Sequence, residues 1–113
     1  MARKKRLTTE AVLRATAVQF NLIPDQVIAK TRKRHVLVPR QIAQHIAWTR
    51  KTDTLAEIAR KTRVIQHGTI LHSSRVISEE CELYADRKED VQDILTRLSL
   101  TGYNTEIPKP KTD

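Results

Sequence analysis

The residues best suited to chemistry in this chain form a polar turn that leads into an amphipathic segment. Residues 65–77 read Ile-Gln-His-Gly-Thr-Ile-Leu-His-Ser-Ser-Arg-Val-Ile. The first side chains are short or form hydrogen bonds, whereas the apolar residues that follow recur at helical spacing. A helix that enters the major groove of DNA needs polar groups at its N-terminal tip and an apolar side that packs on the protein. The pattern therefore predicts that a helix beginning near Gln66 contacts base edges.

One face of this helix is expected to be buried. Five residues, spaced by four, three, four and three positions, share that face: Ile70, Ser74, Ile77, Cys81 and Tyr84. The same phase directs four residues outward: Gly68, His72, Arg75 and Glu79. The side chains from Gln66 to Thr69 would then lie at the exposed tip of the helix.

Each residue near this tip also has an ordinary structural explanation. His67 either touches a base or caps the helix locally, and Thr69 either bonds DNA or bonds its own backbone. Gly68 permits close approach of the backbone to a duplex, at a cost in helix stability of about 1 kcal/mol relative to alanine. His72, one turn further along, is either a phosphate contact or simply exposed.

The charge distribution points to a polyanionic partner. The net charge is +8, but residues 1–75 contain 16 Lys and Arg against 4 Asp and Glu, whereas residues 76–113 contain 5 against 9. A basic front and an acidic rear favour an oriented approach to nucleic acid, although a basic protein with a solvated surface would share this composition. Aromatic residues are scarce, which argues against recognition of single-stranded RNA by base stacking.

Phosphate contacts are expected from a basic connection over residues 30–37 and from the cations that flank the polar turn. The predicted contacts are Lys30, Lys33, Arg34, Arg40, Gln41, Arg60, Lys61, Arg63, His72 and Arg75. For Arg40 and Gln41, capping of a helix start is an equal alternative. For the run from Arg60 to Arg63, the alternative is a solvated face.

Other classes of function find little support. Cys81 is the only cysteine, so no internal disulfide forms, and no apolar run approaches the length of a membrane span. His67 and His72 are five residues apart and do not share one helix face, so no metal site is expected. No paired carboxylates or Ser/His/Asp set is evident. We therefore expect neither enzyme activity nor a bound cofactor. We expect the protein to be cytoplasmic and associated with the nucleoid.

The chain divides into a basic N-terminal arm over residues 1–7, a helical domain over residues 8–99 and a flexible tail over residues 100–113. The arm contains Arg3-Lys4-Lys5-Arg6 and either follows phosphates, enters a minor groove or is only a mobile terminus. The tail contains Gly102, Pro108 and Pro110 with little to bury, so we expect disorder from Thr101 onward.

Local signals predict an all-α bundle of five to six helices. Apolar spacing and caps favour helices over 9–20, 24–29, from Pro39 onward, 54–62, 66–84 and 88–98. Asn21 is a plausible stop for the first. Thr54 and Glu57 have the spacing of a capping box. The short helix that they begin, followed by a tight turn and the polar-tipped helix, matches a helix-turn-helix.

These residues resemble the C-terminal DNA-binding domain of the bacterial replication initiators, the DnaA family. The resemblance covers about residues 8–99 and rests on four pieces in order: Lys30-x-Arg32-x-Arg34, Pro39-Arg40-Gln41, Leu55-x-Glu57-Ile58, and His67-x-Thr69-Ile70-Leu71-His72 with Arg75 and Ile77. It implies an all-helical fold with a helix-turn-helix of the Trp-repressor type. It also implies recognition of short duplex sites at replication origins.

The resemblance assigns roles to three residues. Arg32 would reach into the minor groove beside the site, His67 would meet a thymine in the major groove, and Thr69 would contact DNA near the helix start. Gln66 stands where the family usually has aspartate, and Gly68 where it usually has serine or threonine. Since glutamine pairs more naturally with adenine than aspartate does, two outcomes are expected: a preferred site that differs from the family's usual box, or binding that tolerates many sequences.

The turn before the tip also departs from the family, because Arg63-Val64-Ile65 replaces a run such as Gly-Gly-Arg. No phosphate-binding Gly-x-x-x-x-Gly-Lys-Ser/Thr motif occurs, so ATP-driven melting is not expected of this chain, whether it is a stand-alone protein or one domain of a longer one. The expected partner is double-stranded DNA, with a replication initiator or another replication protein as a further partner. The alternative is a protein-interaction module that kept the fold but lost specific base readout.

Overall fold

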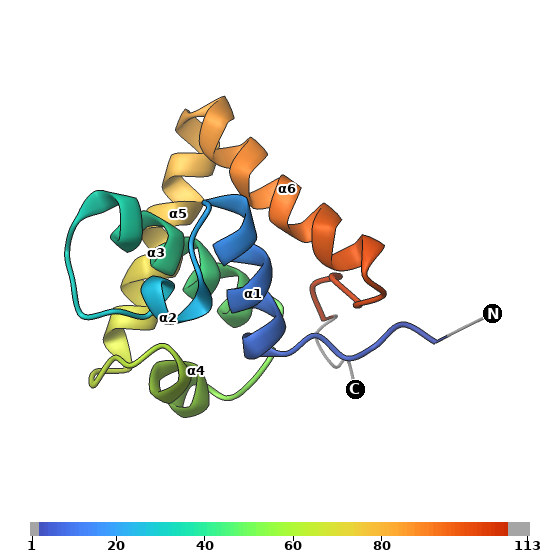
Figure 1. The fold of residues 1–113 in the computed structure, drawn as a ribbon, viewed down its shortest axis with the longest axis horizontal. Coiled ribbons are helices and arrows are strands. Elements are labelled where there is room, and N and C mark those ends of the chain that lie inside the picture. The colour runs from blue at the N-terminus through green and yellow to red at the C-terminus, as the bar shows by residue number, and fades with distance from the viewer. Residues whose placement is uncertain (1–2, 109–113) are drawn as a thin grey trace, which may run out of the picture.

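The computed structural model describes residues 3–108, and over that range the chain forms six α-helices (Figure 1). The helices are α1 (Thr9–Gln19), α2 (Pro24–Val27), α3 (Arg34–Thr49), α4 (Leu55–Lys61), α5 (Gly68–Leu83) and α6 (Ala85–Leu100). The all-α class and the helix-turn-helix arrangement of α4 and α5 that the sequence predicted are confirmed.

Helix α3 is the centre of the bundle, because α1 packs on one side of it and α5 on another, while α6 covers both α1 and α5. The main core cluster joins these four helices through apolar side chains such as Val12, Ile42, Ile77 and Ile94. A second cluster, built from Ala47, Ile58, Ala59 and Ile70, lies where α4 and α5 meet α3. The helix-turn-helix is thus packed onto α3 through its own apolar cluster.

Four helices end in the same turn. The residue after the C-cap has a positive φ at Asn21, Lys51, Arg63 and Gly102, and the next residue's N–H donates back to a carbonyl five positions earlier. This is the Schellman arrangement, which favours glycine because other residues pay a steric cost at positive φ. Arg63 adopts this conformation in the turn between α4 and α5, so its backbone is strained there. Asn21 is the predicted stop of α1.

Helix α3 begins at Arg34, so the prediction that Pro39 starts this helix is wrong. Pro39 lies inside α3, where its missing N–H leaves the His35 carbonyl without its helical partner. Burial of Val36, Val38 and Pro39 compensates for that loss. Residues 34–37 of the segment that we expected to be a connection therefore form the first turn of α3.

Other differences are local. The Thr54 hydroxyl accepts the Glu57 N–H at 3.2 Å as predicted, but the Glu57 carboxylate binds Arg60 instead of completing a capping box. Helix α6 begins at Ala85 rather than at Lys88. Tyr84, predicted to be buried, is 60% exposed because α5 ends before it and the chain turns into α6.

The arm and the tail pair with each other. The Lys5 N–H donates to the Gly102 carbonyl at 2.7 Å, and the Asn104 N–H donates to the Lys5 carbonyl at 2.9 Å. Tyr103 packs against the main core and Leu7 is buried. Over residues 101–108 the structure thus differs from the expected disorder, because a short bridge and one aromatic side chain anchor this segment. Residues 109–113 of the predicted tail lie outside the described part.

Within the described range, every helix falls short of the length and apolar character that crossing a bilayer would need.

Candidate nucleic-acid interface

An open groove brings together the two regions that the sequence analysis singled out. Helix α3, with Arg32 from the basic segment before it, forms one wall, and the turn before α5 with the first turns of α5 forms the other. The lining residues are Arg32, Leu37, Arg40, Gln41, Gln44, Val64, Gln66, Gly68, Thr69, His72 and Ser73. Arg32 therefore lies on the same side of the molecule as Gln66, Gly68 and Thr69. A neighbouring groove is lined by Lys30, Arg32 and Arg63, which extends the basic surface.

The tip of α5 is open to solvent. Gln66, His67, Gly68 and Thr69 are all exposed, while Ile70, the next residue, is fully buried. His67 is the N-cap of α5, but its side chain makes no capping hydrogen bond, so the local-capping alternative is not realised. The imidazole is free to meet a partner outside the chain.

Gly68 is not required by the protein's own packing. A Cβ placed on it would meet nothing within 4 Å, and its φ is not in the left-handed region. Two common reasons for glycine, steric crowding inside the molecule and backbone conformation, are therefore absent. The space beside Gly68 is therefore open on the outer surface of the helix start.

A buried polar network fixes the position of α5. The Gln44 amide of α3 donates to the Thr62 hydroxyl at 3.1 Å, and the Ser73 hydroxyl of α5 donates to the Gln44 carbonyl oxygen at 2.7 Å. Thr62, the C-cap of α4, donates in turn to the Ile58 carbonyl at 2.7 Å. One side chain of α3 therefore ties together both helices of the helix-turn-helix.

A second tie joins α3 to α5. His45 Nδ1 lies 3.0 Å from the Ser74 hydroxyl, and both residues are buried. Burial, and then the positive charge of Arg50, lower the pKa of His45 to about 4. The imidazole is therefore neutral near pH 7, and it is this neutral form that makes the hydrogen bond to Ser74.

Arg40 shapes the basic wall of the groove rather than presenting its charge freely. Its guanidinium donates to the Ala29 carbonyl at 2.6 Å and to the Thr31 carbonyl at 2.9 Å, and it is partly buried. Burial lowers the Arg40 pKa, and the neighbouring charge of Arg32 lowers it further. These two bonds hold the chain on either side of Lys30 in place, which positions the exposed Arg32 at the groove.

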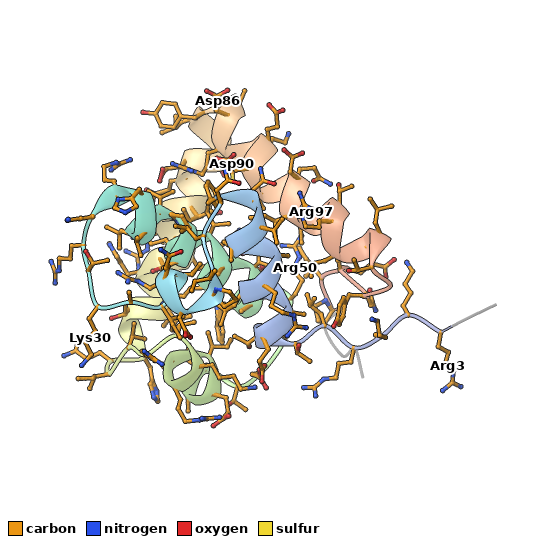
Figure 2. All side chains as sticks on the ribbon, in the orientation of Figure 1. Arg3, Lys30, Arg50, Asp86, Asp90 and Arg97 are labelled. Atoms are coloured by element: carbon orange, nitrogen blue, oxygen red, sulfur yellow. The ribbon has the colours of Figure 1, made fainter. Side chains whose placement is uncertain are left out.

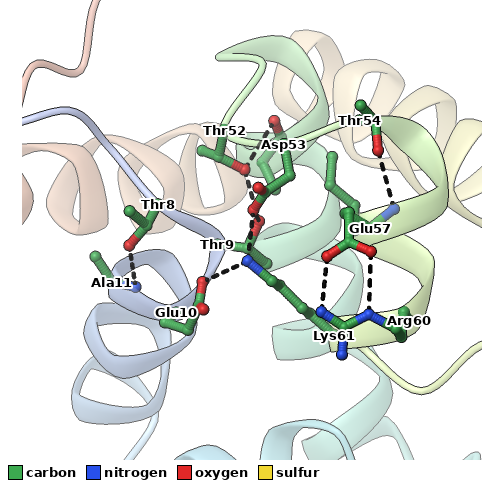
Figure 3. A network of polar contacts seen from close by, with 12 residues as sticks. Thr8, Thr9, Glu10, Ala11, Thr52, Asp53, Thr54, Glu57, Arg60 and Lys61 are labelled. Carbon is green, nitrogen blue, oxygen red and sulfur yellow. Dashed lines mark hydrogen bonds and ion pairs between the residues drawn. The ribbon is translucent and has the colours of Figure 1, made fainter.

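Two of the predicted phosphate contacts already have partners inside the chain (Figure 3). Lys61 donates to Glu10 at 3.0 Å and to Asp53 at 3.1 Å, which links α4 to α1 and raises the Lys61 pKa. Arg60 forms a two-point ion pair with Glu57, at 3.1 and 2.7 Å. Lys61 therefore links two helices through ion pairs, whereas Arg60 forms an exposed ion pair within α4.

The remaining predicted cations are exposed but differ in position. Lys33 and Arg34 lie at the start of α3, outside the groove, and Arg75 lies one turn beyond His72 on α5. Gln41, on α3, lines the groove and is partly exposed. Sequence reasoning missed Gln44, Thr62 and Ser73, since a buried polar side chain in an amphipathic helix looks like a solvated one until its partner is known. Across residues 3–108, no three His, Cys, Asp or Glu side chains gather as metal ligands would.

Comparison with known proteins decides the family. The family model described as bacterial dnaA protein helix-turn-helix matches residues 9–77, which include α1 to α4 and α5 as far as Ile77. The chain belongs to the bacterial DnaA helix-turn-helix family. The DnaA pattern that the sequence analysis noted is therefore confirmed, together with the class of DNA-binding domain that it implies.

The relatives are much longer proteins. The chain is 26% identical over 98 residues to the chromosomal replication initiator protein DnaA of Chloroflexus aggregans. It is 30% identical over 94 residues to the DnaA protein of Rhodopseudomonas palustris, and 33% over 75 residues to that of Bartonella quintana. The three matches cover 87, 83 and 66% of this chain but only 20, 20 and 15% of the relatives.

Proposed function

We propose that this chain binds double-stranded DNA sequence-specifically, in the manner of site recognition by a replication initiator, and without ATPase activity of its own. The tip of α5, from Gln66 to Thr69, enters the major groove, and Arg32 reaches the adjacent minor groove. Lys30, Arg63, His72 and Arg75 contact phosphates around the site. Association with the nucleoid follows from the same proposal.

The observation that carries the proposal is the shared groove. Arg32 comes from the segment between α2 and α3, whereas Gln66, Gly68 and Thr69 come from the start of α5, and all four line one open surface. A cation beside an exposed, polar-tipped helix provides backbone attraction and base contact on the same side.

Arg40, Arg60 and Lys61 are reassigned within this proposal. Arg40 and Lys61 donate to carbonyls or carboxylates on other elements, so they hold the interface in shape rather than neutralise phosphates, whereas Arg60 is paired with Glu57 within α4. Gln41 and the cations Lys33 and Arg34 remain candidate backbone contacts at the edge of the site.

Titration of labelled duplex at several salt concentrations tests the proposal. Wild-type affinity should fall steeply with salt, and Arg32→Ala should make the negative slope of log K against log salt shallower by about 0.9, the value for one phosphate. Lys88→Ala, an exposed cation on α6, serves as the matched control and should leave the slope unchanged. An Arg32→Ala slope equal to that of wild type would contradict the assignment of the basic segment to DNA.

A second candidate function is a protein-interaction module that regulates a replication initiator. The observation that favours it is Ile65, which is 93% exposed in the turn before α5 and offers an apolar contact. Selection of bound duplexes from a random pool separates the two functions. A single enriched site resembling an initiator box supports DNA recognition, whereas no enrichment and weak, salt-insensitive binding support the module.

A further inference from the structure

The end of the molecule remote from the DNA groove has a second basic surface that the proposed function does not use. Arg3 of the N-terminal arm and Lys30 of the basic segment lie at opposite ends of the view along the molecule's longest dimension, which extends 42 Å (Figure 2). A groove at the arm's end is lined by five cations: Lys4, Lys5, Arg6, Arg50 and Lys51. We call this set the arm groove.

The backbone of the arm groove is fixed in place. Lys5 is paired with Gly102 and Asn104, and its ammonium lies 4.4 Å from the centre of the Tyr103 ring. The Arg6 guanidinium donates to the Thr52 carbonyl at 3.1 Å, and Arg50 Nε donates to the Thr105 carbonyl at 3.2 Å. Hydrogen bonds therefore gather the arm, the end of α3 and the segment after α6 into one surface.

The charges of the arm groove are not neutralised within the described part of the chain. None of its five cations forms an ion pair there, although Arg60, Lys61 and Arg87 all do. Among the residues lining this groove, Glu106 is the only acid. Like charges held close together repel one another, so this arrangement lowers stability unless an external anion compensates for it.

The ligand that fits the arm groove is a phosphate backbone. Lys4 and Lys51 supply ammonium donors to it, whereas Arg6 and Arg50 hold the surface together through backbone carbonyls, as Arg40 does at the first groove. No exposed helix tip lines this groove to read bases, so contact would not depend on sequence. The first groove and the arm groove lie toward opposite ends of the molecule's 42 Å dimension, so the few base pairs held at the tip of α5 do not also lie in the arm groove. The anion must therefore come from another stretch of duplex.

We propose that the arm groove binds the backbone of a second duplex segment, so that one copy of the chain bridges two segments of DNA. This inference rests on the proposed function, because the first segment is the one bound by α5 and Arg32. The first contact selects the site, and the second contact holds any neighbouring duplex without regard to sequence.

Capture of a second duplex tests the bridge. A biotinylated duplex on beads is loaded with the full chain, and a fluorescent random duplex is then added. The test variant combines Lys4→Ala with Lys51→Asn, since asparagine tolerates the positive φ of residue 51. The control is Lys88→Ala. The test variant should bind a single duplex within about threefold of wild type but capture roughly tenfold less of the second, as expected for two lost phosphate contacts.

Stoichiometry from native mass spectrometry completes the test. A complex of one protein with two duplexes supports the bridge, and two proteins with two duplexes overturns it in favour of self-association. Unchanged capture by the test variant also overturns it. If wild type binds one duplex but captures no second, only this inference fails. If it binds no duplex at all, the proposed function fails with it.

Discussion

At the scale of single residues, Gly68 gives the sharpest test of contact with DNA. Nothing inside the protein excludes a methyl group at this position, so Gly68→Ala should stabilise the fold, by up to about 1 kcal/mol at a helix start. The same methyl group would stand between the backbone of α5 and a base edge, and duplex affinity should fall roughly tenfold, or about 1.4 kcal/mol.

The informative result is therefore opposite signs in two measurements on one variant, urea unfolding and duplex titration. A matched substitution, Ser78→Ala on the exposed face of α5, should also stabilise the fold slightly through helix propensity but leave duplex affinity unchanged. If Gly68→Ala gains stability and keeps full affinity, the backbone of the tip does not approach DNA closely.

His67 tests base readout at the same tip. Its ring is exposed and makes no capping bond, so His67→Ala should leave stability nearly unchanged. On the selected site the variant should lose roughly 1–3 kcal/mol of binding free energy, and on random duplex much less, because a base contact carries sequence information. Competition titrations measure both losses. Equal losses on the two duplexes would mean that His67 does not read bases, and His35→Ala, an exposed histidine on α3, is the control.

At the scale of elements, the orientation of α5 depends on Gln44. Gln44→Leu keeps much of the volume but removes both the donor to Thr62 and the acceptor for Ser73, so it should cost about 1–3 kcal/mol of unfolding free energy. In a double-mutant cycle, adding Ser73→Ala should recover part of that cost, since the Ser73 hydroxyl is then no longer left without a partner. Urea unfolding of the four proteins gives the coupling energy.

Additive losses, within about 0.5 kcal/mol, would show that Gln44 and Ser73 do not act as a pair. The exposed Gln92→Leu on α6 controls for the change of side-chain type. Because Gln44 is buried, a coupled loss of stability accompanied by weaker duplex binding would identify it as a positioning residue for the tip.

The elements also show which parts of the structure the sequence could predict. The polar-tipped helix, the helix-turn-helix pair and the stop at Asn21 depend on signals within one or two turns, such as apolar spacing and turn residues. The start of α3 is not evident from Pro39, because the burial of Val36 and Val38 extends the helix back to Arg34.

The site was predicted less completely, because its supporting contacts join distant residues. Gln44 meets partners 18 and 29 positions away, and Lys61 meets Glu10 at a separation of 51. A charge or an amide has the same appearance in a sequence whether it faces solvent, a carbonyl or a phosphate. The exposed tip residues were therefore identified correctly as exposed, whereas Arg40 and Lys61 were assigned to phosphates although their partners lie within the chain.

At the scale of the whole molecule, folding stability should depend on pH through His45. Its pKa is about 4 when folded, below the ordinary value of 6.5, so the unfolded chain binds a proton first as pH falls. The contribution of the neutral imidazole is complete above pH 6.5 and is lost progressively toward pH 4. As pH falls from 7 to 5, the loss of this contribution should lower the unfolding free energy by about 2 kcal/mol.

Because His45 Nδ1 meets Ser74 on α5, protonation should loosen the packing of the DNA-contacting helix as well as the core. Urea unfolding at pH 7, 6 and 5 measures the effect, and His45→Gln should flatten the profile in this range, whereas the exposed His35→Gln should not. Should the substitution prevent folding, an NMR titration of the His45 ring in the wild-type protein provides the same test. A midpoint near 6.5 would show that the imidazole is not held neutral by the fold, and that the domain does not couple proton binding to the position of α5.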